Sequence, residues 1–226
     1  MTATTIVFDL DGTLIDTAPD LVASLNYTIA ACDLEPVTFA DLTHLVGQGA
    51  RMMIRRAFDL RDRTLSEDQV PMLLMRFIEH YQSAMPGESK PYPGLLDALE
   101  RLKLEGFILA VCTNKMESLA RELLTSLDLT HHFAALTGGD SFAVRKPDPA
   151  HLVKTISLAG GDPSNAIMIG DSINDIMAAK NANLPSIAVP FGYSDVPVET
   201  LSPTRIITHF DQLTAELINE LVSLAR

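Results

Sequence analysis

Carboxylate side chains gather directly after two short apolar runs of this 226-residue sequence. Asp9 and Asp11 follow the first run, and Asp171 and Asp175 follow a later one. Four carboxylates brought to one point would repel each other, and hard divalent cations with oxygen ligands relieve that repulsion. We therefore predict a magnesium site formed by the side chains of Asp9 and Asp171 and the backbone carbonyl of Asp11. Ser172 and Asp175 would support these ligands from behind, which is compatible with a second role in starting a helix.

Two further segments carry groups that suit a phosphoryl ligand. Thr113 and Asn114 end another apolar run, and Lys146 lies in a loop stiffened by two prolines. The lysine ammonium is a compact positive charge that can pair with both a carboxylate and a phosphoryl oxygen. We predict that the phosphoryl oxygens are held by Thr13, Thr113, Asn114 and Lys146.

The elements that must position these groups alternate along most of the chain between strand-like and helical patterns. The expected strands lie at residues 5–8, 107–112, 135–137, 166–169, 186–189 and 205–208. Amphipathic segments with helical spacing lie between them, and this alternation predicts a doubly wound α/β fold with a parallel, Rossmann-like sheet. Open sheets of this kind bind ligands beyond the carboxyl ends of their strands, which is where the polar residues fall.

One interval breaks the alternation. Residues 16–86 show helical spacing and no convincing strand, and Ser66 and Gln69 form a capping-box pattern before an apolar stripe. We predict an α/β core made of residues 1–15 and 87–226, with residues 16–86 inserted after the first strand as a helical cap. Both connections of the insertion would then lie over the carboxyl edge of the sheet.

The polar motifs resemble those of the haloacid dehalogenase superfamily. Its members show D-x-D-G-T after the first strand, a Ser or Thr ending a second strand, a lysine, and a G-D-x-x-x-D motif. All four occur here in the same order, as Asp9/Asp11, Thr113, Lys146 and Asp171/Asp175. The resemblance covers essentially the whole chain, because the helical insertion is similar to the cap of many members.

The resemblance implies a magnesium-dependent phosphatase. Asp9 would attack the phosphoryl group and form an aspartyl-phosphate, while Asp11 would protonate the leaving alkoxide and later deprotonate the hydrolytic water. The cation and Lys146 would neutralise the repulsion between the Asp9 carboxylate and an anionic ester.

The cap is expected to select the leaving group. The segment containing Gly47, Gln48, Gly49 and Arg51 is similar to a cap loop of phosphoglycolate phosphatases, and residues 191–193 resemble a core loop of the same group. Arg51 could pair with a substrate carboxylate, since guanidinium suits that geometry. A plain helix-capping turn and a surface arginine are the alternatives. The resemblance favours 2-phosphoglycolate as the substrate.

Two other functions are compatible with the same motifs. A sugar-phosphate mutase of the superfamily would hand the phosphoryl group back to a sugar instead of to water. A non-catalytic protein that binds a phosphorylated ligand would keep the fold without turnover, although every expected position is filled.

Composition limits the partners. The formal net charge of −12 argues against a broad nucleic-acid surface, which would need clustered lysine and arginine. The N-terminus has no basic segment followed by a long apolar stretch, and no run of about 18 apolar residues occurs, so we predict a cytoplasmic protein without a membrane partner. We expect a small phosphorylated metabolite as ligand and either a monomer or a homodimer.

Overall fold

The structure is a computed structural model that describes residues 3–38, 41 and 49–224. Its centre is a six-stranded sheet with the order β5-β4-β1-β6-β7-β8, in which every neighbouring pair is parallel. The strands are β1 (Thr5–Phe8), β4 (Ile108–Cys112), β5 (Ala135–Thr137), β6 (Ala166–Gly170), β7 (Ser186–Ala188) and β8 (Arg205–Ile206). All six lie where the β-branched and apolar runs predict them, so the predicted α/β fold class is confirmed.

Helices cover both faces of the sheet. They are α4 (Leu95–Leu104), α5 (Glu117–Ser126), α6 (Pro149–Leu158), α7 (Ile173–Asn181) and α8 (Ala215–Leu224), with the short 3-10 turns η3 (Thr130–His132), η4 (Val198–Leu201) and η5 (Phe210–Gln212). Successive side chains of β1 point to opposite faces. Ile6 and Phe8 pack in the cluster with α4, α5 and α8, whereas Val7 packs in the cluster with α6 and α7.

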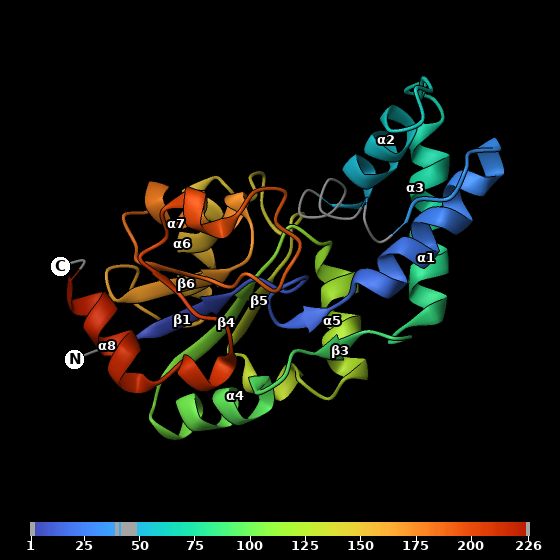
Figure 1. Cartoon of the computed structure of the whole chain (residues 1–226). Coiled ribbons are helices and arrows are strands. Elements are labelled where there is room, and N and C mark those ends of the chain that lie inside the picture. Colours follow the sequence, from blue (N-terminus) through green and yellow to red (C-terminus); the bar gives the residue numbers. More distant parts are fainter. Residues whose placement is uncertain (1–2, 39–40, 42–48, 225–226) are drawn as a thin grey trace.

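Among the described residues, three α-helices lie between positions 17 and 89 of the chain and stand apart from the sheet at one end of the molecule (Figure 1). They are α1 (Ala18–Ile29), continued by the 3-10 turn η1 (Ala30–Cys32), α2 (Ala50–Asp59) and α3 (Val70–Ala84). Their buried residues form a cluster of their own, with Leu25 from α1, Ile54 from α2 and Phe77 from α3. Leu119 of α5 joins this cluster from the other side, so α5 contacts both the sheet and the three helices.

A short antiparallel ribbon joins the two parts of the molecule. β2 (Ile15–Asp16) pairs with β3 (Lys90–Pro91), so the segments that lead into and out of the three helices lie side by side. The sequence did not predict this ribbon, because strands of two residues carry no recognisable alternation. Asp20 strengthens the same junction by accepting hydrogen bonds from the backbone N–H groups of Glu88 and Ser89.

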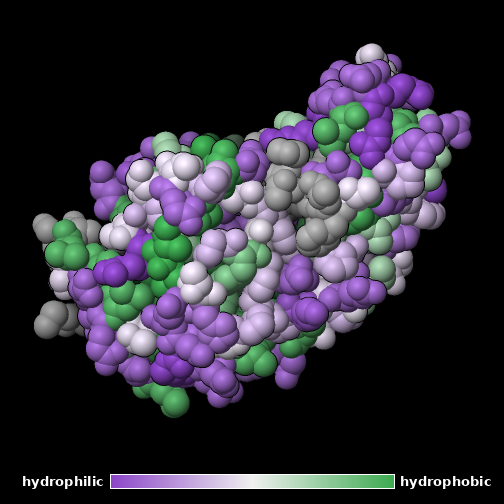
Figure 2. All heavy atoms as spheres, viewed as in Figure 1, coloured by the Kyte–Doolittle hydropathy of each residue, from purple (hydrophilic) through white to green (hydrophobic). Residues whose placement is uncertain are grey.

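Hydrophilic and hydrophobic residues are distributed unevenly over the surface (Figure 2). On the face in Figure 2, hydrophilic residues dominate the outer end of the three-helix part, and hydrophobic residues reach the surface in small groups. Within the described residues, no helix combines the length and the apolar character needed to cross a membrane. Both termini lie at the end of the molecule opposite α1, α2 and α3 (Figure 1).

Candidate active site

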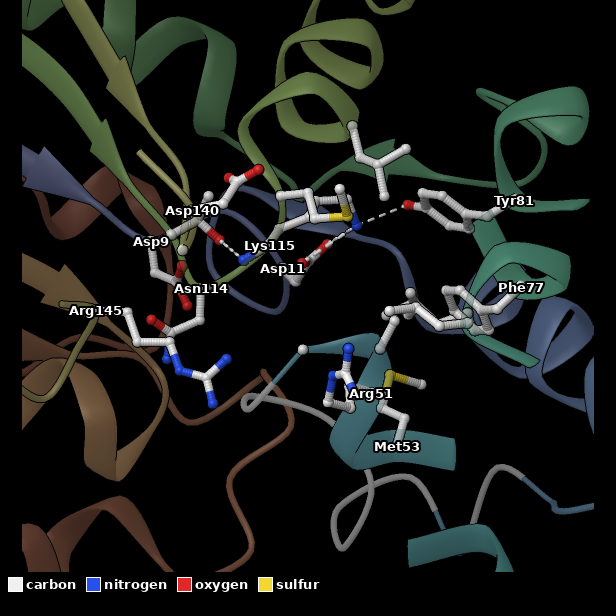
Figure 3. A pocket seen from close by; sticks show the side chains of 18 residues that line it. Asp9, Asp11, Arg51, Met53, Phe77, Tyr81, Asn114, Lys115, Asp140 and Arg145 are labelled. Atoms are coloured by element: carbon white, nitrogen blue, oxygen red, sulfur yellow. Dashed lines mark hydrogen bonds and ion pairs between the residues drawn. The ribbon is translucent and has the colours of Figure 1, made fainter. Parts of the chain in front are cut away.

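A pocket of about 200 Å³ lies between the carboxyl edge of the sheet and the three helices (Figure 3). The sheet side contributes polar side chains that follow β1 and β4, including Asp9, Asp11 and Thr113. The helical side contributes apolar side chains such as Met53 and Phe77. The pocket therefore has one charged wall, where chemistry can take place, and one largely apolar wall.

Asp9 is paired with a buried lysine. The Lys146 Nζ lies 2.9 Å from Asp9 Oδ1 and 2.6 Å from Asp175 Oδ1. The contact with Asp9 is close but poorly aligned, and Asp9 Oδ1 is buried without an oriented hydrogen-bond donor. Burial alone would lower the pKa of Lys146, but Asp175 and Asp9 together raise it, so the ammonium stays charged. The sequence prediction that Lys146 meets Asp9 agrees with this geometry.

The loop that carries Lys146 has its own buried support. The imidazole of His151 accepts a hydrogen bond from the Lys146 backbone N–H through Nδ1 at 3.2 Å, and its Nε2 lies 3.1 Å from the Thr137 hydroxyl. Burial, reinforced by the charge of Lys146, lowers the pKa of His151 to about 4. A neutral imidazole therefore holds the lysine loop at neutral pH.

Asp171 is fixed from two sides. Its Oδ1 accepts a hydrogen bond from the Thr13 hydroxyl at 2.9 Å, and its Oδ2 accepts one from the Tyr193 backbone N–H at 2.7 Å. The single proton of the fully buried Thr13 hydroxyl is thus directed at Asp171 and away from the pocket. This differs from the predicted contact between Thr13 and a phosphoryl oxygen, and the reason is the direction of one hydroxyl group.

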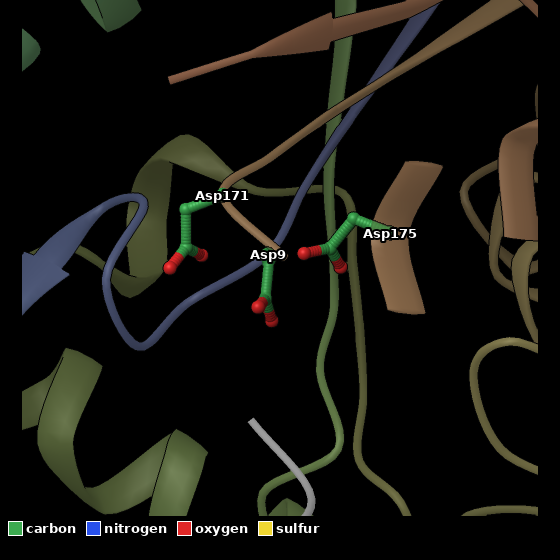
Figure 4. A group of neighbouring side chains, drawn as sticks. All are labelled: Asp9, Asp171 and Asp175. Carbon is green, nitrogen blue, oxygen red and sulfur yellow. The ribbon is translucent and has the colours of Figure 1, made fainter. Parts of the chain in front are cut away.

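The acidic group has the donor set of a divalent-cation site. Asp9, Asp171 and Asp175 each bring a carboxylate oxygen within 4.8 Å of the others, and their side chains turn toward a common region (Figure 4). Burial and then the charge of Asp175 raise the pKa of Asp9 to about 7, and burial also raises that of Asp171. Crowded buried carboxylates with an unsatisfied oxygen on Asp9 fit a hard cation, which would restore their ionised form.

Asp175 is held by Ser172 and by the Lys146 ammonium. Its Oδ2 accepts hydrogen bonds from the backbone N–H and hydroxyl of Ser172 in a capping box at the start of α7, and its Oδ1 faces the Lys146 ammonium. A cation at that oxygen would meet the positive charge of Lys146. Ser172 and Asp175 thus start α7 together, and their role in supporting cation ligands stays a prediction.

Asp11 is held by residues that the sequence reasoning did not select. Lys115 Nζ lies 3.0 Å from Asp11 Oδ1 and 3.0 Å from the Tyr81 hydroxyl of α3 (Figure 3). The Thr17 hydroxyl donates to Asp11 Oδ1 at 2.8 Å. The Lys115 ammonium also lies 4.4 Å from the centre of the Tyr81 ring. In the sequence, the one indication of this contact is the position of Lys115 two residues after Thr113, at the end of a predicted strand.

Thr113 and Asn114 lie at the tip of β4, as predicted. Thr113 is buried at the pocket wall, and its hydroxyl oxygen accepts a hydrogen bond from the Lys115 backbone N–H at 3.2 Å, which leaves its own proton for another acceptor. Asn114 Nδ2 donates to the Lys146 carbonyl at 3.1 Å and so ties the β4 tip to the lysine loop.

The predicted cap residues fall partly outside the described residues, since Gly47 and Gln48 are not among them. Gly49 precedes α2 with a φ of +83°, a conformation that favours glycine, and a Cβ there would lie 3.4 Å from the Asn114 carbonyl oxygen. Arg51 lines the pocket on the helical side, and Arg145, which the sequence reasoning did not single out, lines it on the sheet side.

The chain matches the family model described as haloacid dehalogenase-like hydrolase over residues 6–189. It is 59% identical to a phosphoglycolate phosphatase of Agrobacterium fabrum, over 96% of this chain and 93% of that protein. It is 50% identical to a phosphoglycolate phosphatase of Mesorhizobium japonicum, over 97% of each. The crystal structure of a predicted phosphoglycolate phosphatase from Haemophilus somnus matches with a TM-score of 0.88 and 31% identity, over 94% of this chain and 97% of that chain.

Proposed function

This chain belongs to the haloacid dehalogenase-like hydrolase family, and from that premise we propose that it is a magnesium-dependent phosphatase of small phosphate monoesters, with 2-phosphoglycolate as the favoured substrate. The proposal rests on one observation: the buried side chains of Asp9, Lys146 and Asp171 lie close together at the carboxyl edge of the sheet, beside the pocket. The relatives named phosphoglycolate phosphatase support the choice of substrate.

Asp9 is the proposed nucleophile. One carboxylate oxygen forms a bond to phosphorus while the bond from phosphorus to the leaving alkoxide breaks, and Asp11 gives its proton to that alkoxide. In the second half, Asp11 takes a proton from water, the water oxygen bonds to phosphorus, and the bond from Asp9 to phosphorus breaks. Inorganic phosphate leaves, and both carboxylates return to their starting states.

The cation would be held by the side chains of Asp9 and Asp171 and by the Asp11 backbone carbonyl. When bound, Mg²⁺ supplies positive charge that reduces the repulsion between a carboxylate and a phosphate ester and stabilises the transferring group. Thr13 and the Tyr193 backbone N–H orient Asp171 for this role. Lys146 adds a fixed positive charge beside Asp9, and Thr113 and Asn114 line the place where the phosphoryl oxygens would lie.

The helical segment, residues 16–86, would act as a cap over a core formed by residues 1–15 and 87–226. A substrate with a carboxylate beside its phosphate carries more negative charge than the phosphate alone, and Arg51, Lys115 and Arg145 line the same pocket. These cations favour an ester whose leaving group carries a carboxylate over one whose leaving group is uncharged. We expect the substrate to be a small phosphorylated metabolite of this kind. We also expect the enzyme to be cytoplasmic and to act as a monomer or a homodimer.

Release of inorganic phosphate from 2-phosphoglycolate, with and without Mg²⁺, tests the proposal. The wild-type chain should turn over this ester in Mg²⁺ and lose turnover in a chelator, and Asp9→Asn should lose at least about 10⁴-fold in kcat. Asp195→Asn makes the same chemical change at an exposed position and should keep wild-type turnover. Wild-type rates for Asp9→Asn would reject the mechanism, and interconversion of hexose phosphates with little phosphate release would assign a mutase instead.

A further inference from the structure

The loop that follows β7 contacts the acidic group and the cap connections at the same time. Tyr193 donates its backbone N–H to Asp171 Oδ2 at 2.7 Å. Its hydroxyl donates to Asp16 Oδ1 at 2.6 Å and accepts a hydrogen bond from the Ala18 backbone N–H at 2.9 Å. One residue therefore joins a proposed cation ligand to the segment that leads into the helices.

The surroundings of Tyr193 leave it little freedom. The side chain is 7% exposed and packs against Ala18 at the start of α1. Gly12 lies so close that a Cβ on it would come within 2.9 Å of the Tyr193 ring and 2.5 Å of Asp171 Oδ2. The ring, the β1 turn and the Asp171 carboxylate thus form one tightly packed unit.

The connecting segment that Tyr193 holds reaches the other side of the reaction centre as well. Asp16 is the last residue of β2 and pairs with Lys90 of β3, while Thr17, the next residue, donates its hydroxyl to Asp11 Oδ1. Consecutive residues of the outgoing connection are therefore hydrogen-bonded to Tyr193 and to Asp11. A displacement of this connection would act on both sides of the site.

The returning connection rests on the same loop. The Tyr92 ring lies 4.6 Å from the Phe191 ring, between centres, and the Tyr92 hydroxyl donates to the Phe191 carbonyl at 3.3 Å. Among the described residues, no hydrogen bond joins Tyr92 to Asp171, but the Tyr92 hydroxyl interacts with the Tyr193 hydroxyl. The returning connection is therefore tied to the same loop as the outgoing one.

We propose that Tyr193 is a positioning residue whose hydroxyl, held by Asp16 and Ala18, fixes its own backbone N–H against Asp171 and so sets the cation affinity of the acidic group. The proposal rests on the proposed function only in taking Asp171 as a cation ligand. Neighbours that orient a metal ligand change metal affinity by about 10- to 100-fold when they are removed. The hydroxyl acts one step further away, so its effect belongs at the lower end of that range.

Cation binding to the metal-free protein gives a readout that needs no turnover. Free Mn²⁺ can be followed by electron paramagnetic resonance, with Mg²⁺ as competitor, for the wild type and for Tyr193→Phe, which keeps the ring and the backbone donor. We expect about tenfold weaker binding of both ions. Tyr27→Phe removes a tyrosine hydroxyl from α1, at a residue that is 45% exposed, and should bind both ions within about twofold of the wild type.

A double-mutant cycle separates positioning from general loosening of the fold. Asp16→Ala should weaken Mn²⁺ binding to a similar extent. Both substitutions remove the same hydrogen bond, so the double variant should bind Mn²⁺ as tightly as the single variant with the lower affinity. The proposal would be overturned by wild-type Mn²⁺ affinity in Tyr193→Phe, by an equal loss of affinity in Tyr27→Phe, or by fully additive losses in the double variant. A wild type that binds Mn²⁺ but hydrolyses no phosphate ester would reject the proposed function alone, since the binding comparison would still decide the role of Tyr193.

Discussion

The Asp11 carboxylate is held by two neighbours that come from distant parts of the chain. Lys115 approaches it from the tip of β4, and Thr17 from the connection into α1. A general acid must sit within hydrogen-bond reach of the leaving oxygen, so in the proposed mechanism these two contacts decide where Asp11 delivers its proton. The contribution of Lys115 should therefore depend on how much the leaving group needs a proton.

Lys115→Met tests this dependence. We expect kcat for an alkyl phosphate such as 2-phosphoglycolate to fall about 100-fold, because an unfixed Asp11 delivers its proton poorly. Hydrolysis of p-nitrophenyl phosphate should fall much less, since its leaving group departs readily without a proton. Lys154→Met changes an exposed lysine and should leave both rates unchanged. Equal losses for the two esters would show that Lys115 does not act through Asp11.

The individual residues also show where sequence reasoning reaches its limit. Asp9, Lys146 and Asp171 were predictable, because strand tips of a parallel sheet converge and only a few residue types suit a cation or a phosphoryl group. Lys115 was missed, because its ammonium reaches a carboxylate 104 positions away and sequence spacing does not encode that reach. Thr13 was given a different partner, because the direction of a hydroxyl proton is decided by packing.

At the scale of elements, the end of β6 depends on a glycine. Gly170 is the last residue of that strand, and a Cβ on it would lie 2.3 Å from Asp175 Cβ on the first turn of α7. The strand and the helix can therefore approach closely only without a side chain at this position. Because Asp175 faces the Lys146 ammonium, a shift of α7 would reach Asp9, the proposed nucleophile, through that lysine.

Gly170→Ala should damage activity more than stability. We expect kcat/KM for 2-phosphoglycolate to fall about 100-fold or more and the free energy of unfolding to fall by about 1–3 kcal/mol, because the added methyl group displaces Asp175. A Cβ at Gly106, which follows α4 with a φ of +85°, meets no atom within 4 Å. Gly106→Ala should cost about 1 kcal/mol through backbone strain and leave turnover unchanged. Similar turnover in both variants would contradict this role for Gly170.

Of the three helices between positions 17 and 89, α1 and α3 were predictable from their apolar spacing, but the attachment of these helices to the sheet was not. Regular apolar spacing revealed Leu73, Phe77 and Tyr81 of α3, which are all buried in the cluster of the three helices. The β2–β3 ribbon has no comparable pattern. Because the three helices have a hydrophobic cluster of their own, we expect a packing defect in α3 to destabilise α1, α2 and α3 before it destabilises the sheet.

Phe77→Ala tests that separation. Loss of a buried phenyl group costs about 3–5 kcal/mol where the surroundings cannot collapse. Hydrogen exchange should therefore accelerate in α1, α2 and α3 and change little in β1 and β4. Met75→Ala alters an exposed side chain of the same helix and should leave exchange unchanged. Equal acceleration in the strands and the helices would mean that the two parts unfold as one unit.

At the scale of the whole molecule, the fold concentrates buried negative charge at one sheet edge of a protein whose net charge is already −12. Burial and neighbouring acids raise the pKa of Asp9 from its ordinary 3.8 to about 7. Between these two values the folded protein without a cation holds more protons than the unfolded chain. Its free energy of unfolding therefore falls as pH rises through this window.

His151 acts in the opposite direction and must be separated from Asp9. Its pKa is lowered from 6.5 to about 4 by burial and by Lys146, so its contribution is present above about pH 6.5 and is lost as pH falls toward 4. The two windows overlap. A comparison of variants that differ only at Asp9 removes the His151 contribution, because that group is common to both proteins.

Urea unfolding of the metal-free wild type and Asp9→Asn between pH 5 and 8 makes this comparison. We expect Asp9→Asn to gain stability relative to the wild type as pH rises, reaching on the order of 1–3 kcal/mol at pH 8, because it removes one crowded carboxylate. Saturating Mg²⁺ should stabilise the wild type more than the variant, since the cation binds the ionised group that the variant has lost. Asp195→Asn should follow the wild type throughout. Parallel curves for the wild type and Asp9→Asn, with equal Mg²⁺ effects, would show that the cluster stores no such electrostatic cost and would remove the physical reason for placing a cation there.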